Sequence, residues 1–446
     1  MPMLTCFKTY DIRGRVGVDL DTGIARRIGA GFAAHLSART VVLGRDNRAS
    51  SGALDDAVAA GLMAQGVEVL DIGLGGTEEV YAATDHFGAD GGIMITASHN
   101  PIDYNGMKMV GARAAPLPDL SAIRDLADAD RPATGEGVRR DVQRQARAAY
   151  VDRVAGFVDR ASLRPLHIVV DAGNGAAGPT FDALAEALSD TPLTFTRIRH
   201  APDGTFPHGI PNPLLPENRH LTAEAVRTHG ADMGVAWDGD FDRCFLFDAQ
   251  GNFIDGEYIV SLLAEVFLAR EPGATIVHDP RIQWATQDAV ARAGGRAVAS
   301  RTGHVFLKQA LRDMGAVYGG EMSAHHYFRD FACCDSGMIP WLMVAELISR
   351  TGSPLADLVA ARRAAFPSSG EINFRVAEAA AAVARVEAAF DGARDRTDGL
   401  SMDMGTWRFN LRASNTEPLL RLNVESRGNA GLVADKVAEI TRILLP

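Results

Sequence analysis

A run of alternating acidic residues, DGDFDR, is the strongest chemical signal in the sequence. It places carboxylates at Asp238, Asp240 and Asp242, between the apolar segments GVAW and CFLFD. Carboxylates at positions i, i+2 and i+4 of an extended segment lie on one face and can converge on one ion. Oxygen-only ligands favour a hard cation such as Mg²⁺ over a transition metal. Without a cation the three charges would repel one another, so a metal site explains the run better than a solvated acidic turn does.

A second candidate is the serine of TASHNP (Thr96–Pro101), which directly follows the apolar segment GGIMI. α/β proteins place ligand-binding groups at the ends of such strands, which makes Ser98 a candidate nucleophile. Its neighbour His99 would point away from it in an extended segment and is therefore expected to be a poor general base. Taken alone, the motif is explained more simply by an Asn-Pro turn in which the serine caps a helix.

The segment RASNTEP (Arg412–Pro418) has the composition of a phosphate-binding loop. A guanidinium, hydroxyls, an amide and turn N–H groups stand close together between the predicted strands RFNL and LLRLNVE. Such donors bind oxyanions, although a polar hairpin turn has a similar composition.

The segment GEMSAHHYF (Gly320–Phe328) offers groups that can bind sugar hydroxyls. Glu321 is a hydrogen-bond acceptor and Ser323 is a donor. The adjacent His325 and His326 are a poor metal-binding pair.

A glycine-rich segment supports a competing interpretation. GNGAAG (Gly173–Gly178) matches the dinucleotide fingerprint, but the next strand ends in Arg199 and His200 rather than in an acidic residue. An NADP-dependent oxidoreductase is therefore one alternative, and a tight turn that needs glycine is the preferred explanation. A catalytically silent binding protein is a second alternative, which the complete set of Ser98 and three aspartates disfavours.

Together, a serine at a strand end, a three-carboxylate site, a sugar-binding loop and a phosphate-binding loop imply phosphoryl transfer to or from a sugar. Such chemistry needs positioning and charge neutralisation more than covalent chemistry by the protein. The sequence contains no P-loop or kinase loop, so ATP is not the implied donor.

The elements that must position these residues follow a repeated pattern of apolar run, glycine-rich turn and Ala/Leu-rich helix. The pattern starts near Thr40 and restarts near Leu166 and Ala274, which predicts three α/β domains with mixed, mostly parallel sheets. After Phe366 it changes to apparent antiparallel strands flanked by helices, which predicts a smaller α+β domain. The polar stretch 131–145 is interpreted as a linker.

Composition excludes several classes of protein. The 446 residues are 47% hydrophobic and 23% charged, with a net charge of -11, which argues against a general nucleic-acid binder. The four cysteines form no CxxC pair and are expected to be idle thiols. We expect a cytoplasmic protein with no membrane segment, since no apolar stretch is long enough to span a bilayer.

In this order, YDIRG, TASHNP with YNGMK, DGDFDR, GEMSAHHYF and RASNTEP resemble the α-D-phosphohexomutase superfamily over nearly the whole chain. The resemblance is to bacterial phosphomannomutases, including phosphomannomutase/phosphoglucomutases. It implies four domains, each lending one loop to a central cleft. The expected domain boundaries are 1–143, 144–250, 251–364 and 365–446.

The resemblance also implies roles for individual residues. Ser98 would carry the phosphoryl group, and its phosphate would complete the Mg²⁺ shell of the three aspartates. Lys108, in YNGMK, and His304, in RTGHVFLK, match acid/base or active-site positions, and Arg243 should contact the phosphoserine or the sugar. The expected substrate-binding residues are Tyr10, Arg13, Arg281, Glu321, Ser323, Arg412, Ser414, Asn415, Thr416 and Arg421.

Two residues of this chain depart from the pattern of many members of the superfamily, and a third bears on the subgroup. Ala324 stands where many have Gly, and Arg281 stands where many have Lys. Met322 stands where phosphoglucosamine mutases usually have Gln, which argues against a phosphoglucosamine mutase.

The implied reaction interconverts mannose 6-phosphate and mannose 1-phosphate through a 1,6-bisphosphate intermediate. Mannose 1-phosphate is the precursor of GDP-mannose. Mg²⁺ and a hexose 1,6-bisphosphate activator are the expected cofactors, and a monomer or weak homodimer that binds small sugar phosphates is expected. A phosphoglucomutase or a dual enzyme is the alternative, because groups that read the 3- and 4-hydroxyls do not contact the hydroxyl at C2.

Overall fold

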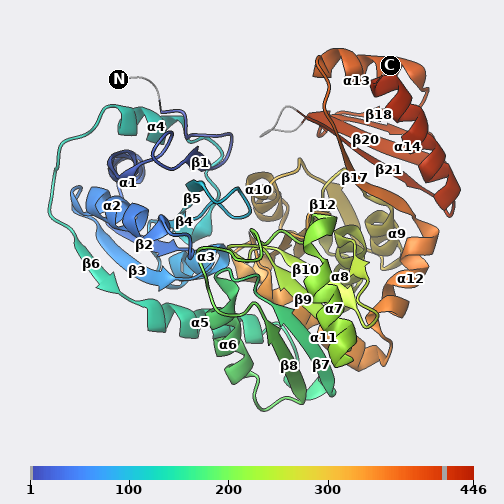
Figure 1. Cartoon of the computed structure of the whole chain (residues 1–446), viewed down its shortest axis with the longest axis horizontal. Helices are drawn as coiled ribbons and strands as arrows, with labels where there is room; N and C mark the ends of the chain where they lie inside the picture. The colour runs from blue at the N-terminus through green and yellow to red at the C-terminus, as the bar shows by residue number, and fades with distance from the viewer. Residues whose placement is uncertain (1–3, 414–418, 446) are drawn as a thin grey trace. The chain divides into compact units, whose positions relative to one another are not determined.

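A computed structural model describes residues 4–413 and 419–445 of the chain (Figure 1). These residues form two units. Unit 1 contains the residues up to Phe253 together with Asp330–Gly352. Unit 2 contains Ile254–Arg329 together with the residues from Ser353 onward. Each unit is built around two β-sheets.

The first sheet of unit 1 is mixed, with its strands in the order β1-β5-β4-β2-β3-β6. The pairs β2/β3, β2/β4 and β3/β6 are parallel, whereas β5 runs antiparallel to both β1 and β4. The strands are β1 (Ile12–Arg15), β2 (Thr40–Arg45), β3 (Glu68–Leu74), β4 (Gly91–Ile95), β5 (Tyr104–Gly111) and β6 (Val138–Asp141). The helices are α1 (Thr22–Leu36), α2 (Ser51–Met63), α3 (Thr77–His86), α4 (Ser121–Asp128) and α5 (Gln143–Ala155).

The stretch 131–145, predicted to be a linker region, contains regular structure. It contains β6, which extends the parallel part of the sheet by pairing with β3, and it reaches the start of α5. The strand is short and mostly exposed, so its sequence lacks the apolar run that marks the inner strands.

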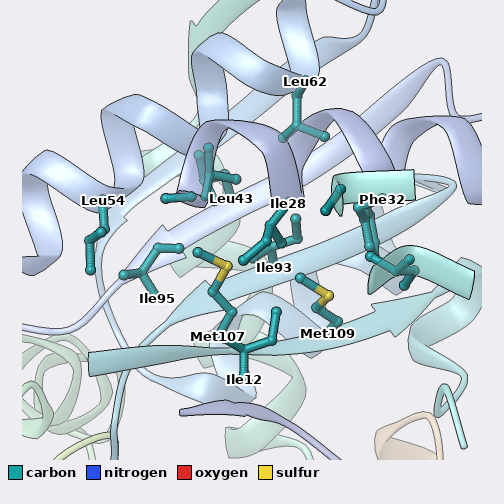
Figure 2. Packing of buried hydrophobic residues seen from close by; sticks show 14 of the residues in the cluster. Ile12, Ile28, Phe32, Leu43, Leu54, Leu62, Ile93, Ile95, Met107 and Met109 are labelled. Atoms are coloured by element: carbon teal, nitrogen blue, oxygen red, sulfur yellow. The ribbon is translucent and has the colours of Figure 1, made fainter. Parts of the chain in front are cut away.

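Both faces of the first sheet are covered by apolar side chains. Ile93 and Ile95 of β4 belong to the cluster packed with α1 and α2, whereas Met94 between them belongs to a cluster with Val80 of α3. This alternation explains why the strand reads as a continuous apolar run. Figure 2 shows the first cluster, with Ile12, Ile28, Phe32, Leu43, Leu54, Leu62, Ile93, Ile95, Met107 and Met109 labelled.

In the second sheet of unit 1, β10, β9, β7 and β8 lie in that order. The strand β7 is parallel to β8 and β9, and β10 runs antiparallel to β9. These elements are β7 (Leu166–Asp171), β8 (Leu193–Ile198), β9 (Met233–Trp237) and β10 (Cys244–Asp248), with helices α6 (Ala177–Ala187) and α7 (His220–His229).

The helix α11 (Met338–Thr351) belongs to unit 1 although it comes late in the sequence. Its Trp341 ring packs against Phe181 of α6, at 5.9 Å between centroids, and against Phe195 of β8 at 6.0 Å. The indole N–H of Trp237 donates a 2.8 Å hydrogen bond to the carbonyl of Gly337, just before the helix. These contacts join α11 to the sheet that precedes the three aspartates.

Unit 2 contains one mixed and one antiparallel sheet. In the first, β12 is parallel to β13 and β14, and β15 runs antiparallel to β14. These strands are β12 (Thr275–His278), β13 (Arg296–Ala299), β14 (Tyr318–Gly320) and β15 (His326–Phe328). The accompanying helices are α8 (Gly256–Arg270), α9 (Trp284–Arg292), α10 (His304–Met314) and α12 (Leu355–Ala365).

The antiparallel sheet of unit 2 has the order β17-β21-β20-β19-β18. The predicted segment SMDMGTWRFNLRAS contains two strands, β19 and β20, which pair with each other. The elements are β17 (Ser368–Phe374), α13 (Ala379–Ala389), β18 (Ala393–Asp395), β19 (Leu400–Asp403), β20 (Trp407–Ala413), β21 (Leu420–Ser426) and α14 (Ala430–Leu444). The predicted fold class, with three mixed α/β sheets and a terminal α+β part, is confirmed.

Within the described residues, no helix combines the length and apolar character needed to cross a membrane. The four cysteines are free and buried.

Candidate active site

Ser98 lies just beyond the end of β4, with its backbone in the left-handed region at a φ of +49°. Its hydroxyl donates a 2.8 Å hydrogen bond to Oδ2 of Asp238 and lies 3.1 Å from Nδ1 of His99. The prediction that His99 points away from Ser98 was therefore wrong, because the segment is not extended here. Burial, together with the nearby charge of Arg243, holds the pKa of His99 well below its usual value.

The three aspartates of DGDFDR converge as predicted. One carboxylate oxygen from each lies within 4.8 Å of the others, and all three residues are buried. The segment is not extended, however: Phe241 has a φ of +46°, and this turn rather than strand alternation brings the side chains together. Among the described residues, the Oδ1 atoms of Asp238 and Asp240 have no hydrogen-bond partner. Buried, unpartnered carboxylate oxygens fit a hard cation such as Mg²⁺.

Lys108 reaches the same cluster from β5. Its ammonium lies 2.8 Å from Oδ2 of Asp240 and also contacts Oδ2 of Asp242. Burial alone would lower the pKa of Lys108, but Asp240 and Asp242 outweigh burial and raise it above its usual value. Burial also favours the neutral form of Asp240 and would raise its pKa, but Lys108 outweighs burial and lowers it. The pair is therefore an ammonium and a carboxylate.

Two arginines approach the loops from different elements. Arg243 donates through Nε and Nη2 to Oδ2 of Asp238, at 2.9 and 2.7 Å, and its Nη2 lies 2.6 Å from Nδ1 of His99. Arg13 of β1 donates to the carbonyl of Thr96, at 2.5 Å. Unit 1 thus brings together the predicted residues Ser98, Lys108, Arg243 and the three aspartates, with Arg13 on the backbone of the serine loop. Tyr10 lies in the turn before β1 and is partly exposed.

Thr77 was not predicted and is part of this cluster. Its hydroxyl donates to Oδ2 of Asp240 at 2.6 Å, and its N–H donates to the carbonyl of the same residue at 3.1 Å. It is the first residue of α3, where the sequence indicates only a helix start. Arg48, whose guanidinium binds the carbonyl of Ser98 at 2.9 Å, was also missed.

In unit 2, the predicted sugar-binding residues lie together. Glu321 accepts the N–H of Gly303 at 2.9 Å through Oε1 and the hydroxyl of Tyr327 at 2.8 Å through Oε2. Arg281 donates to the hydroxyl of Ser323 at 3.1 Å and lies 3.6 Å from Glu321. Gly303 directly precedes His304, so the bond to Glu321 places the start of α10 beside the sugar-binding loop.

Three predicted arginines surround a carboxylate that the sequence analysis missed. Glu371 of β17 lies 3.2 Å from Arg412, 3.5 Å from Arg421 and 3.5 Å from Arg281. Burial would raise the pKa of Glu371, but the three guanidinium groups lower it. Arg412 and Arg421 face each other across β20 and β21. The predicted residues Ser414, Asn415 and Thr416 lie outside the described residues.

The glycine-rich segment forms the tight turn that was preferred for it. Gly173 and Asn174 have φ values of +59° and +58°, between β7 and α6. Arg199, the residue that would have accommodated NADP, donates to Asp171 through Nε at 2.9 Å. The oxidoreductase alternative therefore loses its supporting residue.

The fold and the two groups of residues define the class of the protein: a multidomain α/β enzyme equipped for phosphoryl transfer. Four models of the phosphoglucomutase/phosphomannomutase family match the chain. Those of the α/β/α domains I, II and III match residues 5–132, 148–251 and 255–366, and that of the C-terminal domain matches 371–443. The chain belongs to this family, and it is accordingly an isomerase that acts by intramolecular phosphoryl transfer.

Relatives match over their full lengths. "Phosphohexose mutases" of Xanthomonas campestris pv. campestris is 57% identical, with 99% of each chain covered. "Phosphomannomutase" of Salmonella typhimurium is 57% identical, and that of Escherichia coli K12 is 54% identical, with 100% of each chain covered. The solved structure of a phosphoglucomutase/phosphomannomutase family protein from Burkholderia thailandensis has a TM-score of 0.87 at 32% identity, covering 100% of this chain and 99% of the other.

Proposed function

We propose that the protein is a phosphomannomutase that interconverts mannose 6-phosphate and mannose 1-phosphate through a phosphoserine at position 98 and a 1,6-bisphosphate intermediate. The observation that carries this proposal is the 2.8 Å hydrogen bond from the Ser98 hydroxyl to Asp238, within the three-aspartate cluster. It supports the proposal because a hydroxyl that can accept a phosphoryl group lies beside three carboxylates that can hold a divalent cation. The names of the full-length relatives support mannose as the sugar.

In this mechanism the residues of unit 1 handle the reacting phosphoryl group. Asp238, Asp240 and Asp242, with the phosphate on Ser98, would hold Mg²⁺, which neutralises charge on the group being transferred. Arg243 donates to the same oxygen of Asp238 as the Ser98 hydroxyl does, and it is proposed to contact a phosphate on Ser98. Lys108 is the proposed acid/base group of this unit, and Tyr10 and Arg13 are proposed substrate contacts.

The residues of unit 2 bind the sugar phosphate. Glu321 and Ser323 would read the 3- and 4-hydroxyls, and His304 is a proposed second acid/base residue. Arg281, Arg412 and Arg421, with Ser414, Asn415 and Thr416, would hold the phosphate that is not reacting. Guanidinium groups suit this task because they bind either end of the bisphosphate by paired hydrogen bonds.

A dual phosphomannomutase/phosphoglucomutase is the second candidate. The relative named "Phosphohexose mutases" favours it, as does the expectation that Glu321 and Ser323, proposed to read the 3- and 4-hydroxyls, do not contact the hydroxyl at C2. The four domain boundaries, the bisphosphate activator, the cytoplasmic location and the monomer or weak homodimer stay predictions.

The test is a coupled assay that compares mannose 1-phosphate and glucose 1-phosphate at equal concentration, with Mg²⁺ and a hexose 1,6-bisphosphate. We expect turnover of mannose 1-phosphate, and comparable turnover of both sugars would favour the dual enzyme. Ser98→Ala should nearly abolish turnover and should lack the species about 80 Da heavier that phosphorylation produces. Full activity of Ser98→Ala would contradict the phosphoserine mechanism.

A further inference from the structure

One buried arginine holds the backbone of the loop that carries Ser98. Arg48 follows β2 and is 3% exposed. Through Nη2 it donates to the carbonyls of Ser98, at 2.9 Å, and Asn100, at 2.6 Å. Through Nη1 it donates to those of Pro101, at 2.8 Å, and Tyr104, at 3.0 Å. A single side chain thus binds three carbonyl groups of the serine loop and the first carbonyl of β5.

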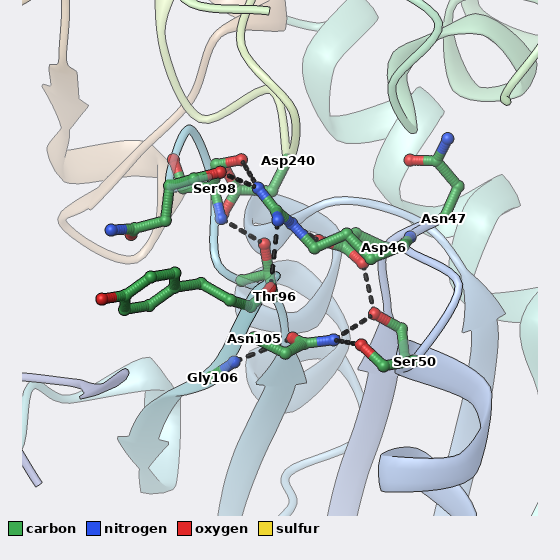
Figure 3. A network of polar contacts seen from close by, with 12 residues as sticks. Asp46, Asn47, Ser50, Thr96, Ser98, Asn105, Gly106 and Asp240 are labelled. Carbon is green, nitrogen blue, oxygen red and sulfur yellow. Dashed lines mark hydrogen bonds and ion pairs between the residues drawn. The ribbon is translucent and has the colours of Figure 1, made fainter. Parts of the chain in front are cut away.

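The side chain of Arg48 is itself held by Asp46. Asp46 lies 3.6 Å from Nε of Arg48 and accepts its backbone N–H at 3.0 Å. The same carboxylate accepts the hydroxyl of Ser51 at 2.5 Å, and Ser51 accepts from the amide of Asn105 at 2.9 Å. Figure 3 shows this network, which runs from Asn105 through Asp46 to the loop around Ser98. These contacts fix the orientation of the Arg48 guanidinium.

The loop needs such support because Ser98 has an unfavourable backbone conformation. A left-handed φ is uncommon for a residue with a side chain and is kept only where the surroundings enforce it. The N–H of Ser98 is held by the hydroxyl of Thr96 at 2.8 Å, and its carbonyl is held by Arg48. A Cβ atom on Gly239 would lie only 2.6 Å from that carbonyl oxygen. The backbone of the aspartate segment therefore packs closely against the carbonyl of Ser98.

We propose that Arg48 is a positioning residue for phosphoryl transfer, which fixes the backbone of the serine loop so that the Ser98 hydroxyl points at Asp238. It acts through Ser98, because its guanidinium binds the backbone of the serine loop. The role rests on the proposed function of Ser98. Its planar fork of donors is essential, because a lysine ammonium offers three donors from one point and cannot span carbonyls as far apart as those of Ser98 and Tyr104.

The test compares Arg48→Lys with a matched control, Arg139→Lys. Arg139 also uses its guanidinium to bind several oxygens, those of Asp55, Asp56 and Asp71, but it has no hydrogen bond to the serine loop. We expect kcat of Arg48→Lys to fall roughly 10- to 100-fold, with KM changed less than about twofold, because a displaced nucleophile is slow but leaves substrate binding intact. The control should keep kcat within about twofold, since it leaves the loop unchanged.

A second readout does not depend on turnover. Hydrogen exchange of the backbone amides in 98–104 should become at least about tenfold faster in Arg48→Lys, with the rest of unit 1 unchanged, and should stay slow in the control. Chemical rescue is a separate test. The loss of kcat in Arg48→Ala should be partly restored by guanidinium ions, which have the same planar set of donors, and not by methylammonium.

Three results would overturn the proposal: unchanged kcat in Arg48→Lys, unchanged exchange in the loop, or a general loss of folding, which would make the role of Arg48 purely structural. Failure of the proposed function is a separate outcome, seen as a wild-type protein that converts neither sugar phosphate.

Discussion

The ammonium of Lys108 lies 2.8 Å from Oδ2 of Asp240, and the hydroxyl of Thr77 donates to the same oxygen at 2.6 Å. The other oxygen of this carboxylate, Oδ1, has no hydrogen-bond partner among the described residues. Asp238 is arranged alike: Ser98 and Arg243 bind its Oδ2, and its Oδ1 has no such partner. In both residues one oxygen is fixed by other side chains and the other is available to a cation, as the proposed function requires.

Asp240→Asn should weaken Mg²⁺ binding and reduce turnover sharply. The substitution removes one of three charges. Because Lys108 and Thr77 both donate to the position of Oδ2, the amide oxygen should turn toward them and leave its NH2 group facing the cation. If the ion neutralises the transferring group, the barrier rises by several kcal/mol, or about a thousandfold in kcat. Steady-state kinetics against Mg²⁺ concentration measures both effects.

The wild-type enzyme supplies the control for this prediction. Chelation by EDTA should inhibit it, and added Mg²⁺ should restore its activity. An enzyme that is indifferent to chelation would refute the assignment of the three aspartates as metal ligands.

Thr77→Val should lower the affinity for Mg²⁺ by roughly 10- to 100-fold, in line with the loss of other groups that orient metal ligands. Valine has the same shape but leaves Oδ2 of Asp240 with Lys108 alone. Thr77→Ser keeps the hydroxyl and serves as the control, with near-normal affinity. A titration of activity with Mg²⁺ distinguishes the two. Equal affinity in both variants would mean that the threonine only begins α3.

The sequence revealed those parts of the site whose residues are neighbours in the chain. The three aspartates and the serine motif are short and local, so their chemistry can be read directly. Thr77 and Asp240 are 163 positions apart, and nothing in the sequence around Thr77 distinguishes it from an ordinary helix start. Arg48 and Glu371 were missed for the same reason. The role of a buried arginine or glutamate depends on contacts with residues that are distant in the sequence.

Backbone conformation caused the other differences. His99 was expected to point away from Ser98, and the aspartate segment was expected to be extended. Both expectations assumed alternating side chains, whereas Ser98 and Phe241 have left-handed φ values. Neither residue is a glycine, so residue type gave no sign of the turn. Inner strands such as β4, β9 and β10 were easier to predict, because their apolar runs are buried on both faces.

Arg412→Ala should raise KM and lower kcat together, because a loosely held sugar phosphate is also badly positioned. Arg412 is one of three arginines around Glu371, so its removal also takes away positive charge where the phosphate is proposed to bind. The bisphosphate intermediate should escape more often, which makes the variant more dependent on added hexose 1,6-bisphosphate.

Arg412→Lys provides the comparison for this prediction. It should recover only part of the loss, because a point charge cannot replace a planar fork. If Arg412→Ala left both kinetic constants unchanged, the RASNTEP loop would be an ordinary polar turn.

The stability of the protein should depend on pH through Glu257, in the first turn of α8. This residue is 2% exposed, and the hydroxyl of Ser368 donates to its Oε1 at 2.6 Å. Burial, with the nearby charge of Asp255, raises the pKa of Glu257 from 4.5 to about 8. The folded state therefore binds the proton more tightly than the unfolded state does. Unfolding releases a proton between these two pH values, so the contribution of Glu257 to stability falls as pH rises through this window.

Glu257→Gln removes this titration and keeps an acceptor for Ser368. Relative to wild type, the variant should gain stability steadily from pH 4.5 to pH 8, by an amount on the order of 5 kcal/mol in all, and the difference should then level off. Thermal unfolding midpoints of the two proteins across this range measure the trend. Asp435→Asn, at an exposed position on α14, is the control and should show no such slope. A difference between Glu257→Gln and wild type that stays constant with pH would mean that Glu257 has the same pKa in the folded and the unfolded protein, so that other interactions offset its burial.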